Sequence, residues 1–359
     1  MGRANIKKFD FVRDTGIAIG FLLVGLVASP LVANWWTENI ANSPERLAKL
    51  LQNAEIEEFN KVRKNVNTLV EFDAIDLSER DLSGVQLNSL ILTNANLTKT
   101  NLANSNLEKL AASGDLSGII LYNSTLSRSD LSNSDLQGSN LTSAQLNGSN
   151  LRGAYLFEAD LTDADLSYAD LTDADLRETD LTDASLFDAE LSNADLNNAD
   201  LTDADLSYAA LRNVDLNKAD LLNAGLFDAD LSNADLNEAD LTDADLGGAD
   251  LSNAGLFFAD LSNADLGDAA LPNAGLFDAD LSNADLRGAA LPNASLFDAD
   301  LSNSDLRDID LKYVNLTRTV LVNTYFLCED ILNADLLHLL NSSEIRTFNS
   351  ERKEVDTCY

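Results

Sequence analysis

The chain has 359 residues, of which 45% are hydrophobic, and a formal net charge of −36 at pH 7. This apolar content, with only 17 glycines and 4 prolines, excludes an intrinsically disordered chain, which would have too little to bury. The charge is uneven, because residues 1–70 hold nine Lys/Arg and seven Asp/Glu, whereas residues 71–359 hold 15 and 53.

The first predicted element is a membrane segment. A basic N-terminal segment, residues 1–14, precedes residues 15–37, which carry no charge. About 20 apolar residues suffice to cross a bilayer. We therefore expect a transmembrane helix or signal anchor over residues 15–37, with the tryptophans in an interfacial belt. The expected anchor residues are Gly16, Phe21, Leu22, Leu23, Trp35 and Trp36.

The flanking charges predict the topology. Four basic residues precede the segment and only Arg46 and Lys49 follow closely, so the N-terminus should be cytoplasmic. This predicts a single-pass membrane protein whose remaining chain lies in a periplasm or lumen. The alternatives are a cleaved signal peptide, which gives a secreted or lumenal protein, and a buried helix of a soluble protein.

Residues 38–71 form a linker in which we predict an amphipathic helix from Pro44 to about Leu69. Ser43 suits the N-cap, Pro44 the first helical position and Glu45 the positive end of the helix dipole. Its apolar stripe can cover the open end of the repeats that follow, or it can form a coiled-coil seam. A coiled-coil seam predicts a homodimer through residues 44–69. An end of the repeat domain is the alternative dimer surface.

A five-residue repeat governs most of the remaining chain. Leu occupies every fifth position from Leu116 to Leu336, except at Phe326 and Ile331. Neither an α-helix nor a flat strand keeps side chains five residues apart on one face. The backbone must therefore turn once per repeat so that each Leu points inward, which predicts a solenoid.

The repeat unit resembles that of the pentapeptide-repeat family, as in Ala164-Asp165-Leu166-Ser167-Tyr168. The resemblance covers residues 72 to 336 and implies an all-β solenoid, a right-handed quadrilateral β-helix with four pentapeptides per coil. The near-identity of residues 256–275 and 276–295 independently indicates a coil of this length.

The repeats fall into two blocks that differ in phase. Leucines recur every five residues in a first block, residues 72–107, but the next centre, Leu116, follows Leu107 after nine residues. Residues 108–115 are thus a phase slip, either a bulge, a tightened turn or a break between two stacked segments. The main β-helix then spans residues 116–336, and residues 337–359 are a predicted C-terminal cap and tail.

Few residues point to chemistry. His338 is the only histidine, and the two cysteines, Cys328 and Cys358, lack metal-ligand spacing, although they could pair. We expect no enzyme activity, no metal and no cofactor. Aspartates of neighbouring coils should lie about 4.8 Å apart, where like charges raise each other's pKa.

Outward-facing phenylalanines form the candidate binding site. Phe157, Phe257, Phe277 and Phe297 each follow a Leu and are separated by whole numbers of coils, so they should share one face. Phe187 and Phe227 should line the opposite face. The column could be a docking stripe, or a ladder in which each ring supports the next.

Together these features predict a non-enzymatic, membrane-anchored acidic scaffold, a rod that binds an unidentified protein partner. The alternative rests on the resemblance, since some acidic pentapeptide-repeat proteins mimic DNA and inhibit type II topoisomerases. The average charge density permits mimicry, at one charge per ~1.7 Å as in duplex DNA. A rod across a membrane would not reach such an enzyme, and nucleic acid itself is disfavoured as a partner.

Overall fold

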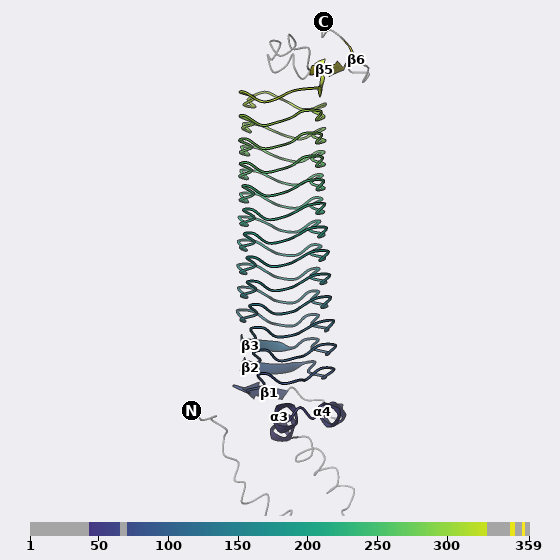
Figure 1. The fold of residues 1–359 in the computed structure, drawn as a ribbon, viewed down its shortest axis with the longest axis vertical. Helices are drawn as coiled ribbons and strands as arrows, with labels where there is room; N and C mark the ends of the chain where they lie inside the picture. The colour runs from purple at the N-terminus through teal and green to yellow at the C-terminus, as the bar shows by residue number, and fades with distance from the viewer. Residues whose placement is uncertain (1–42, 65–69, 329–344, 349–353, 356–359) are drawn as a thin grey trace, which may run out of the picture.

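The computed structural model describes residues 43–64, 70–328, 345–348 and 354–355. The chain forms a tall stack of coils, with α3 (Pro44–Gln52) and α4 (Ile56–Arg63) at its N-terminal end (Figure 1). The strands lie near the two ends of the stack. They are β1 (Val70–Asp73), β2 (Leu90–Asn96), β3 (Ala111–Asp115), β4 (Thr324–Leu327), β5 (Ile345–Phe348) and β6 (Glu354–Val355).

Each coil of the main stack consists of four successive pentapeptides. Parallel backbone bridges join Asp160 to Asp180 and Asp165 to Ser185, and such bridges recur at every fifth residue. The coil therefore has four sides, one pentapeptide each, which confirms the predicted pentapeptide-repeat β-helix. Leu161 shows how coils connect: its N–H donates to the carbonyl of Asp180 at 2.7 Å.

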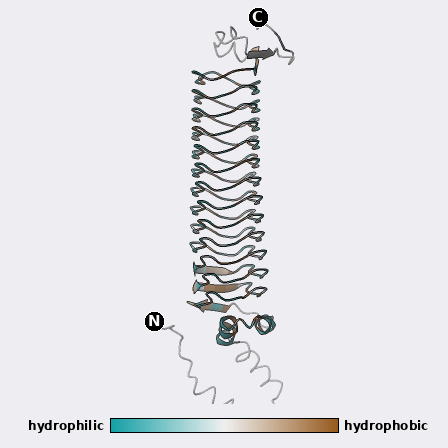
Figure 2. Cartoon of the chain, in the orientation of Figure 1, coloured by the Kyte–Doolittle hydropathy of each residue, from teal (hydrophilic) through white to brown (hydrophobic). Residues whose placement is uncertain are grey.

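Leucine and alanine fill the interior. Leu161 and Leu166 are fully buried, and Ala159 and Ala164 are 1% exposed. Each buried leucine stabilises the fold by about 1.5–3 kcal/mol relative to an exposed one. In Figure 2 the hydrophobic residues of β2 stand out, whereas α3 and α4 show hydrophilic residues as well.

A tight turn follows each leucine. The N–H of Ala164 donates to the carbonyl of Leu161 at 3.0 Å, and Asp163, the third residue of this turn, has φ 57°. Residues with positive φ occupy the same position in the turns along the stack. Asn, Asp and Gly tolerate this left-handed conformation best, which explains why they dominate there.

The phase slip is a bulge in one continuous stack. Asn101 pairs with Ile120, so this coil is one residue shorter than the next, and β2 shifts register against β3 between Leu92 and Ala95. Gly114, at the shift, has φ 122°, and a Cβ there would lie 2.5 Å from the carbonyl oxygen of Ala95. The buried core continues through the bulge, so the stack is not broken.

Two helices, and not one, cover the N-terminal end. The predicted Ser43 cap is present, accepting the Arg46 N–H at 3.3 Å, but α3 ends at Gln52 and the chain turns at Ala54, with φ 55°. The prediction of a single helix from Pro44 to about Leu69 is wrong, and residues 65–69 lie outside the described residues.

The apolar side chains of both helices pack against the core of the stack. Leu47, Leu51 and Phe59 are fully buried in the core of the stack. The Asn60 amide also donates to the Gly84 carbonyl and accepts the Gln86 N–H, which ties α4 to the first coils. The stripe predicted as an alternative coiled-coil seam is therefore covered by the chain itself.

The C-terminal end is closed differently. β5 pairs in parallel with β4, and β6 pairs antiparallel with β5. The last described coil is less buried, since Leu316 and Leu321 are only partly covered. Most of the predicted cap and tail, and the repeats expected between residues 329 and 336, lie outside the described residues.

The predicted membrane localisation is contradicted. Among residues 43–64, 70–328, 345–348 and 354–355, no helix is both long enough and apolar enough to cross a membrane. The segment on which the prediction depended, residues 15–37 with anchor residues Gly16, Phe21, Leu22, Leu23, Trp35 and Trp36, lies outside the described residues. The predicted single-pass topology and its secreted alternative are wrong, and none of the described residues supports the membrane as a partner.

Candidate protein-interaction surfaces

Aspartate or asparagine directly before a leucine holds the turn that follows. Asp160 accepts the N–H of Thr162 at 3.1 Å through Oδ1, and Asn140, at the same position one coil earlier, accepts the N–H of Thr142 at 3.1 Å. Asp and Asn side chains commonly form such bonds with the backbone two residues on. Much of the negative charge of the rod therefore belongs to residues that have a structural role.

These bonds also correct the predicted rise in pKa. Hydrogen bonds from the Arg177 side chain lower the pKa of Asp175 below its ordinary value, and the Ser117 hydroxyl and N–H do the same for Asp115. At Asp285, burial raises the pKa, but bonds from Arg287 outweigh it and the net shift is downward. For these three carboxyl groups, donors within the turn lower the pKa, and the predicted rise does not occur.

The four sides of the main stack differ, and we name each by its outward residues. The aspartate face contains Leu161 and the leucines at the same position of the other coils. The tyrosine, asparagine and phenylalanine faces contain Leu166, Leu171 and Leu176 in the same way. The tyrosine and phenylalanine faces are opposite each other, because they are half a coil apart.

The aspartate face carries an unbroken acidic column. Eight aspartates, one in each coil from Asp160 to Asp300, are joined by parallel bridges. Between residues 119 and 303 no Lys or Arg belongs to this face. The cations of the main stack lie on the other three faces, so the aspartate face is more negative than the average surface.

The asparagine face has an amide ladder at its turns. Asn193 donates to Asp173 at 3.1 Å, and Asn273 donates to Asn253 at 3.1 Å. Each amide joins two neighbouring coils. This face is consequently polar and internally paired.

The phenylalanine face brings three of the four predicted site residues together. The rings of Phe277 and Phe297 stack with centroids 5.4 Å apart, and Phe257 meets Phe277 edge-on at 6.4 Å. Phe258, which the prediction did not include, contacts Phe277 at 5.6 Å and is 58% exposed. Phe157 lies on the same face but far down the stack, where the Arg177 guanidinium covers its ring at 5.6 Å.

The tyrosine face has a second aromatic ladder, which the sequence reasoning found only in part. Tyr168, Phe187, Tyr208 and Phe227 alternate up the face, with successive ring centroids 5.4–5.8 Å apart in edge-on contacts. The phenylalanines were predicted to lie here, but the tyrosines were missed because they sit one residue later in their pentapeptides. The alternation of Ser-Tyr and Phe-Asp from one coil to the next was the available signal.

Above this ladder the tyrosine face has a hollow of about 500 Å³. Phe227 lines one part of it and Arg287 another, with Gly247 and Gly267 between them. The glycines leave space where other coils have a side chain. Four aspartates and one arginine line the hollow, so it is negative overall.

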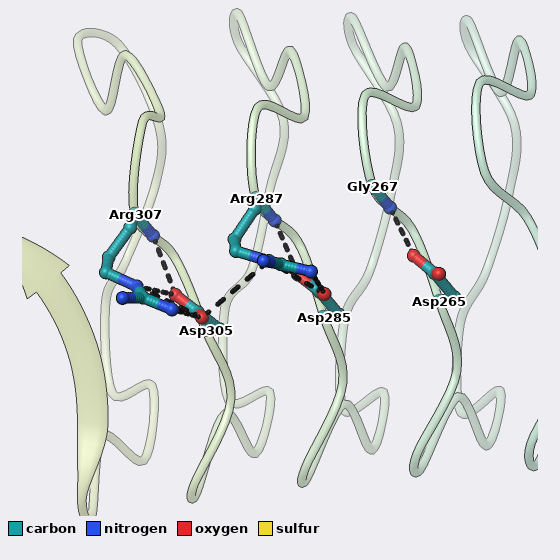
Figure 3. Close-up of polar contacts among 6 residues, drawn as sticks. All are labelled: Asp265, Gly267, Asp285, Arg287, Asp305 and Arg307. Atoms are coloured by element: carbon teal, nitrogen blue, oxygen red, sulfur yellow. Dashed lines mark hydrogen bonds and ion pairs between the residues drawn. The ribbon is translucent and has the colours of Figure 1, made fainter.

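The arginines beside the hollow share one arrangement. In Asp285-Leu286-Arg287, Nε of Arg287 donates to both carboxylate oxygens of Asp285 at 2.8 Å, and Nη2 donates to Oδ2. Arg307 is bound to Asp305 in the same way (Figure 3). We call these segments Asp-Leu-Arg units; a third, on the phenylalanine face, ends in Arg177.

The sequence matches the family model for pentapeptide repeats over residues 71–111 and, in overlapping segments, 119–326. The chain belongs to the pentapeptide-repeat family. Residues 112–118, which no matched segment includes, coincide with the bulge at Gly114. The family match therefore breaks where the coil is one residue short.

Several solved pentapeptide-repeat proteins are similar to the chain. HetL, a cyanobacterial protein from Nostoc involved in heterocyst differentiation regulation, is 28% identical, with 75% of this chain and 95% of HetL covered and a TM-score of 0.25. A protein from the Arabidopsis thaliana thylakoid lumen is 32% identical, with 26% and 61% covered and a TM-score of 0.21. QnrB1, a plasmid-mediated fluoroquinolone resistance protein, is 21% identical, with 62% and 92% covered and a TM-score of 0.22. No curated protein matches the sequence.

The histidine and the two cysteines lie at or beyond the C-terminal end of the described stack. In the described part of the chain, no group of three or more His, Cys, Asp or Glu residues could hold a metal ion. Cys328 is disulfide-bonded. Cys358, the only other cysteine, and His338 lie outside the described residues.

Proposed function

We propose that this pentapeptide-repeat protein is a non-enzymatic acidic rod that binds protein partners along its sides. Exposed aromatic side chains on two opposite faces carry the proposal. Tyr168 and Tyr208 are 60% and 47% exposed, and Phe257 and Phe258 are 44% and 58% exposed. Exposed aromatics gathered on one face are typical of protein-binding surfaces, whereas scattered ones are not.

The aromatic ladders also support the stack, and the exposure of each ring separates the two roles. Phe277 and Phe297 are less exposed than Phe257 and stack on each other, so we assign them to stability. Phe258, Tyr168 and Tyr208 occupy the left-handed turn position, where Asn is the commoner residue. Phe and Tyr are less stable than Asn in this left-handed backbone conformation. Because they do not favour the turn, their presence there favours a role in binding.

Replacement by asparagine tests this role. Phe258→Asn, Tyr168→Asn and Tyr208→Asn place in each turn the residue that Asn198 supplies at the same position of another coil. The lost ring contacts, about 0.5–1.5 kcal/mol per pair, should be largely offset by a better turn residue. We expect thermal stability to stay within a few degrees and cross-linked partners to disappear.

The matched control is Glu238→Asn, one coil below Phe258 at the same turn position. It removes an exposed side chain without removing an aromatic ring. Partner recovery, measured by quantitative mass spectrometry after cross-linking, should match that of the unaltered chain. Equal recovery with the triple variant would instead assign all the rings to stability.

The second candidate function is DNA mimicry, in which the rod inhibits a type II topoisomerase. The acidic column from Asp160 to Asp300, on a face without Lys or Arg, favours it. The predicted membrane topology, which would separate the rod from such an enzyme, is wrong and is therefore no argument against mimicry.

A further inference from the structure

The Asp-Leu-Arg units show how a guanidinium binds to this scaffold. The aspartate Oδ1 accepts its own turn N–H, at 3.0 Å in Asp285, and the guanidinium then covers the outer side of the carboxylate. Both carboxylate oxygens are bound, in the paired geometry that arginine favours with carboxylates. Two such units, ending in Arg287 and Arg307, follow each other directly on the tyrosine face.

The same face continues with two units that lack the arginine. In Asp265-Leu266-Gly267 the carboxylate accepts the Gly267 N–H at 2.8 Å, and in Asp245-Leu246-Gly247 it accepts the Gly247 N–H at 3.0 Å. The turn bond matches that of the Asp-Leu-Arg units, but glycine supplies no side chain to cover the carboxylate. Figure 3 shows this difference between Asp265, with Gly267, and the adjacent arginine-bearing units.

The hollow is the space that these two glycines leave. Arg287 does not fill it, because its Nε and Nη2 are bound to Asp285, and its Nε also lies 3.8 Å from Asp305 in the coil on the other side. At the opposite side Phe227 lies against Gly247, where a Cβ would be 3.3 Å from the ring. The space thus combines two carboxylates, one coil apart, with an aromatic ring.

We propose that this hollow binds an arginine side chain of a protein partner, whose guanidinium takes the position that Arg287 and Arg307 take on their own aspartates. The proposal rests on the proposed function, that the rod binds proteins, and it names the residue recognised. The negative charge of the hollow attracts a cation, and the Phe227 ring can pack against a planar guanidinium. Lysine offers a point charge without the planar pair of donors.

Selective ¹⁵N-glycine labelling of the full chain makes the binding visible. The sequence has 17 glycines, and the amides of Gly247 and Gly267 donate directly to the two carboxylates. The probe is the peptide acetyl-Gly-Arg-Gly-amide, titrated at low salt. We expect it to shift these two amides, whereas the citrulline peptide, a neutral analogue of the same shape, leaves them unchanged.

Two variants test the geometry. Gly267→Arg supplies the missing side chain from within, and a Cβ there meets only Asp265 Oδ1 at 3.0 Å and the Arg287 carbonyl at 3.9 Å, so the fold should be kept. The probe should then no longer shift Gly247. Asp245→Asn with Asp265→Asn keeps the turn acceptor but removes the charge, and should weaken binding about tenfold or more.

The control variant is Asp205→Asn, on the same face but outside the hollow, where Asp205 accepts the Ser207 N–H at 3.0 Å. Its affinity for the probe should equal that of the unaltered chain. Shifts of equal size at Gly118, Gly138 and Gly153, outside the hollow, would indicate general attraction to an acidic rod and would overturn the proposal.

The remaining outcomes are also decisive. If free L-arginine binds as tightly as the peptide, the hollow is a small-molecule site and a protein partner is the wrong source. If the arginine and citrulline peptides act alike, no guanidinium site exists. Partner recovery that is lost with the aromatic variants but unchanged by Gly267→Arg would leave the proposed function standing and reject the hollow alone.

Discussion

Where aspartate or asparagine directly precedes a leucine, its side chain joins the turn through one hydrogen bond, whether or not it is charged. Asp260 accepts the N–H of Ser262 at 2.9 Å, and Asn150 does the same for Arg152 at 3.1 Å. Without an acceptor this N–H would have to be satisfied by water at a partly buried turn. The aspartates of the rod can therefore be neutralised one at a time, by asparagine, with the turn intact.

Substitutions at Asp260 test this at a single residue. Asp260→Ala should speed hydrogen exchange at the Ser262 amide and lower the free energy of unfolding by about 1 kcal/mol, because the turn loses its acceptor. Asp260→Asn should leave both close to their original values. If Asp260→Asn is as damaging as Asp260→Ala, the charge, and not the hydrogen bond, holds the turn.

Among the elements, the position of the bulge and the break between the two helices could not be predicted from the sequence. The slip at residues 108–115 was visible as a missing residue, but the register shift it causes lies between Leu92 and Ala95, in the preceding coil. The sequence shows where along the chain the residue is missing. It does not show that the neighbouring strand, β2, takes up the missing residue by a shift in register. Gly114 was the available signal, as a glycine within the slip.

The break between α3 and α4 has a geometric reason. A single helix from Pro44 to Leu69 would be about 39 Å long at 1.5 Å per residue, whereas one five-residue side spans at most about 17 Å. Its apolar stripe could not remain over the end of the stack. Leu51 and Phe59 both reach the core because the chain turns at Ala54.

Alanine at Gly114 tests the bulge. Gly114→Ala should destabilise the chain by about 2 kcal/mol or more, because its Cβ would meet the Ala95 carbonyl at 2.5 Å and its φ of 122° is unfavourable for any other residue. Gly138→Ala is the control: its φ is 58°, and nothing lies within 4 Å of the added Cβ. That variant should cost about 1 kcal/mol.

Denaturant unfolding followed by circular dichroism measures both variants. Hydrogen exchange at Asn94 and Leu97, next to the bulge, shows whether the damage is local. Equal losses for Gly114→Ala and Gly138→Ala would mean that the bulge is flexible enough to accept a side chain.

For the whole molecule, the distribution of charged residues among the four faces says more about binding than the net charge does. The net charge of −36 was plain from composition, but composition cannot separate the aspartate face from the faces that hold Arg177, Arg212 and Arg287. Assigning each charge to a face requires its position within the coil of four pentapeptides. That period is present in the sequence, and it assigns the charged residues to faces in the same way as the phenylalanines.

The aspartate face yields a test of DNA mimicry that average charge cannot satisfy. Asp200→Asn, Asp220→Asn and Asp240→Asn remove three charges from the acidic column while keeping each turn acceptor. Asp195→Asn, Asp215→Asn and Asp235→Asn remove three charges from the phenylalanine face in the same way.

If the rod imitates a duplex through its aspartate face, the variant of the aspartate face alone should compete less well with labelled DNA for a type II topoisomerase. The competition should also weaken with salt, because it depends on cationic side chains of the enzyme. Equal losses in the two variants would indicate diffuse attraction to a polyanion, and no competition by the unaltered rod would leave protein binding through the aromatic faces as the function.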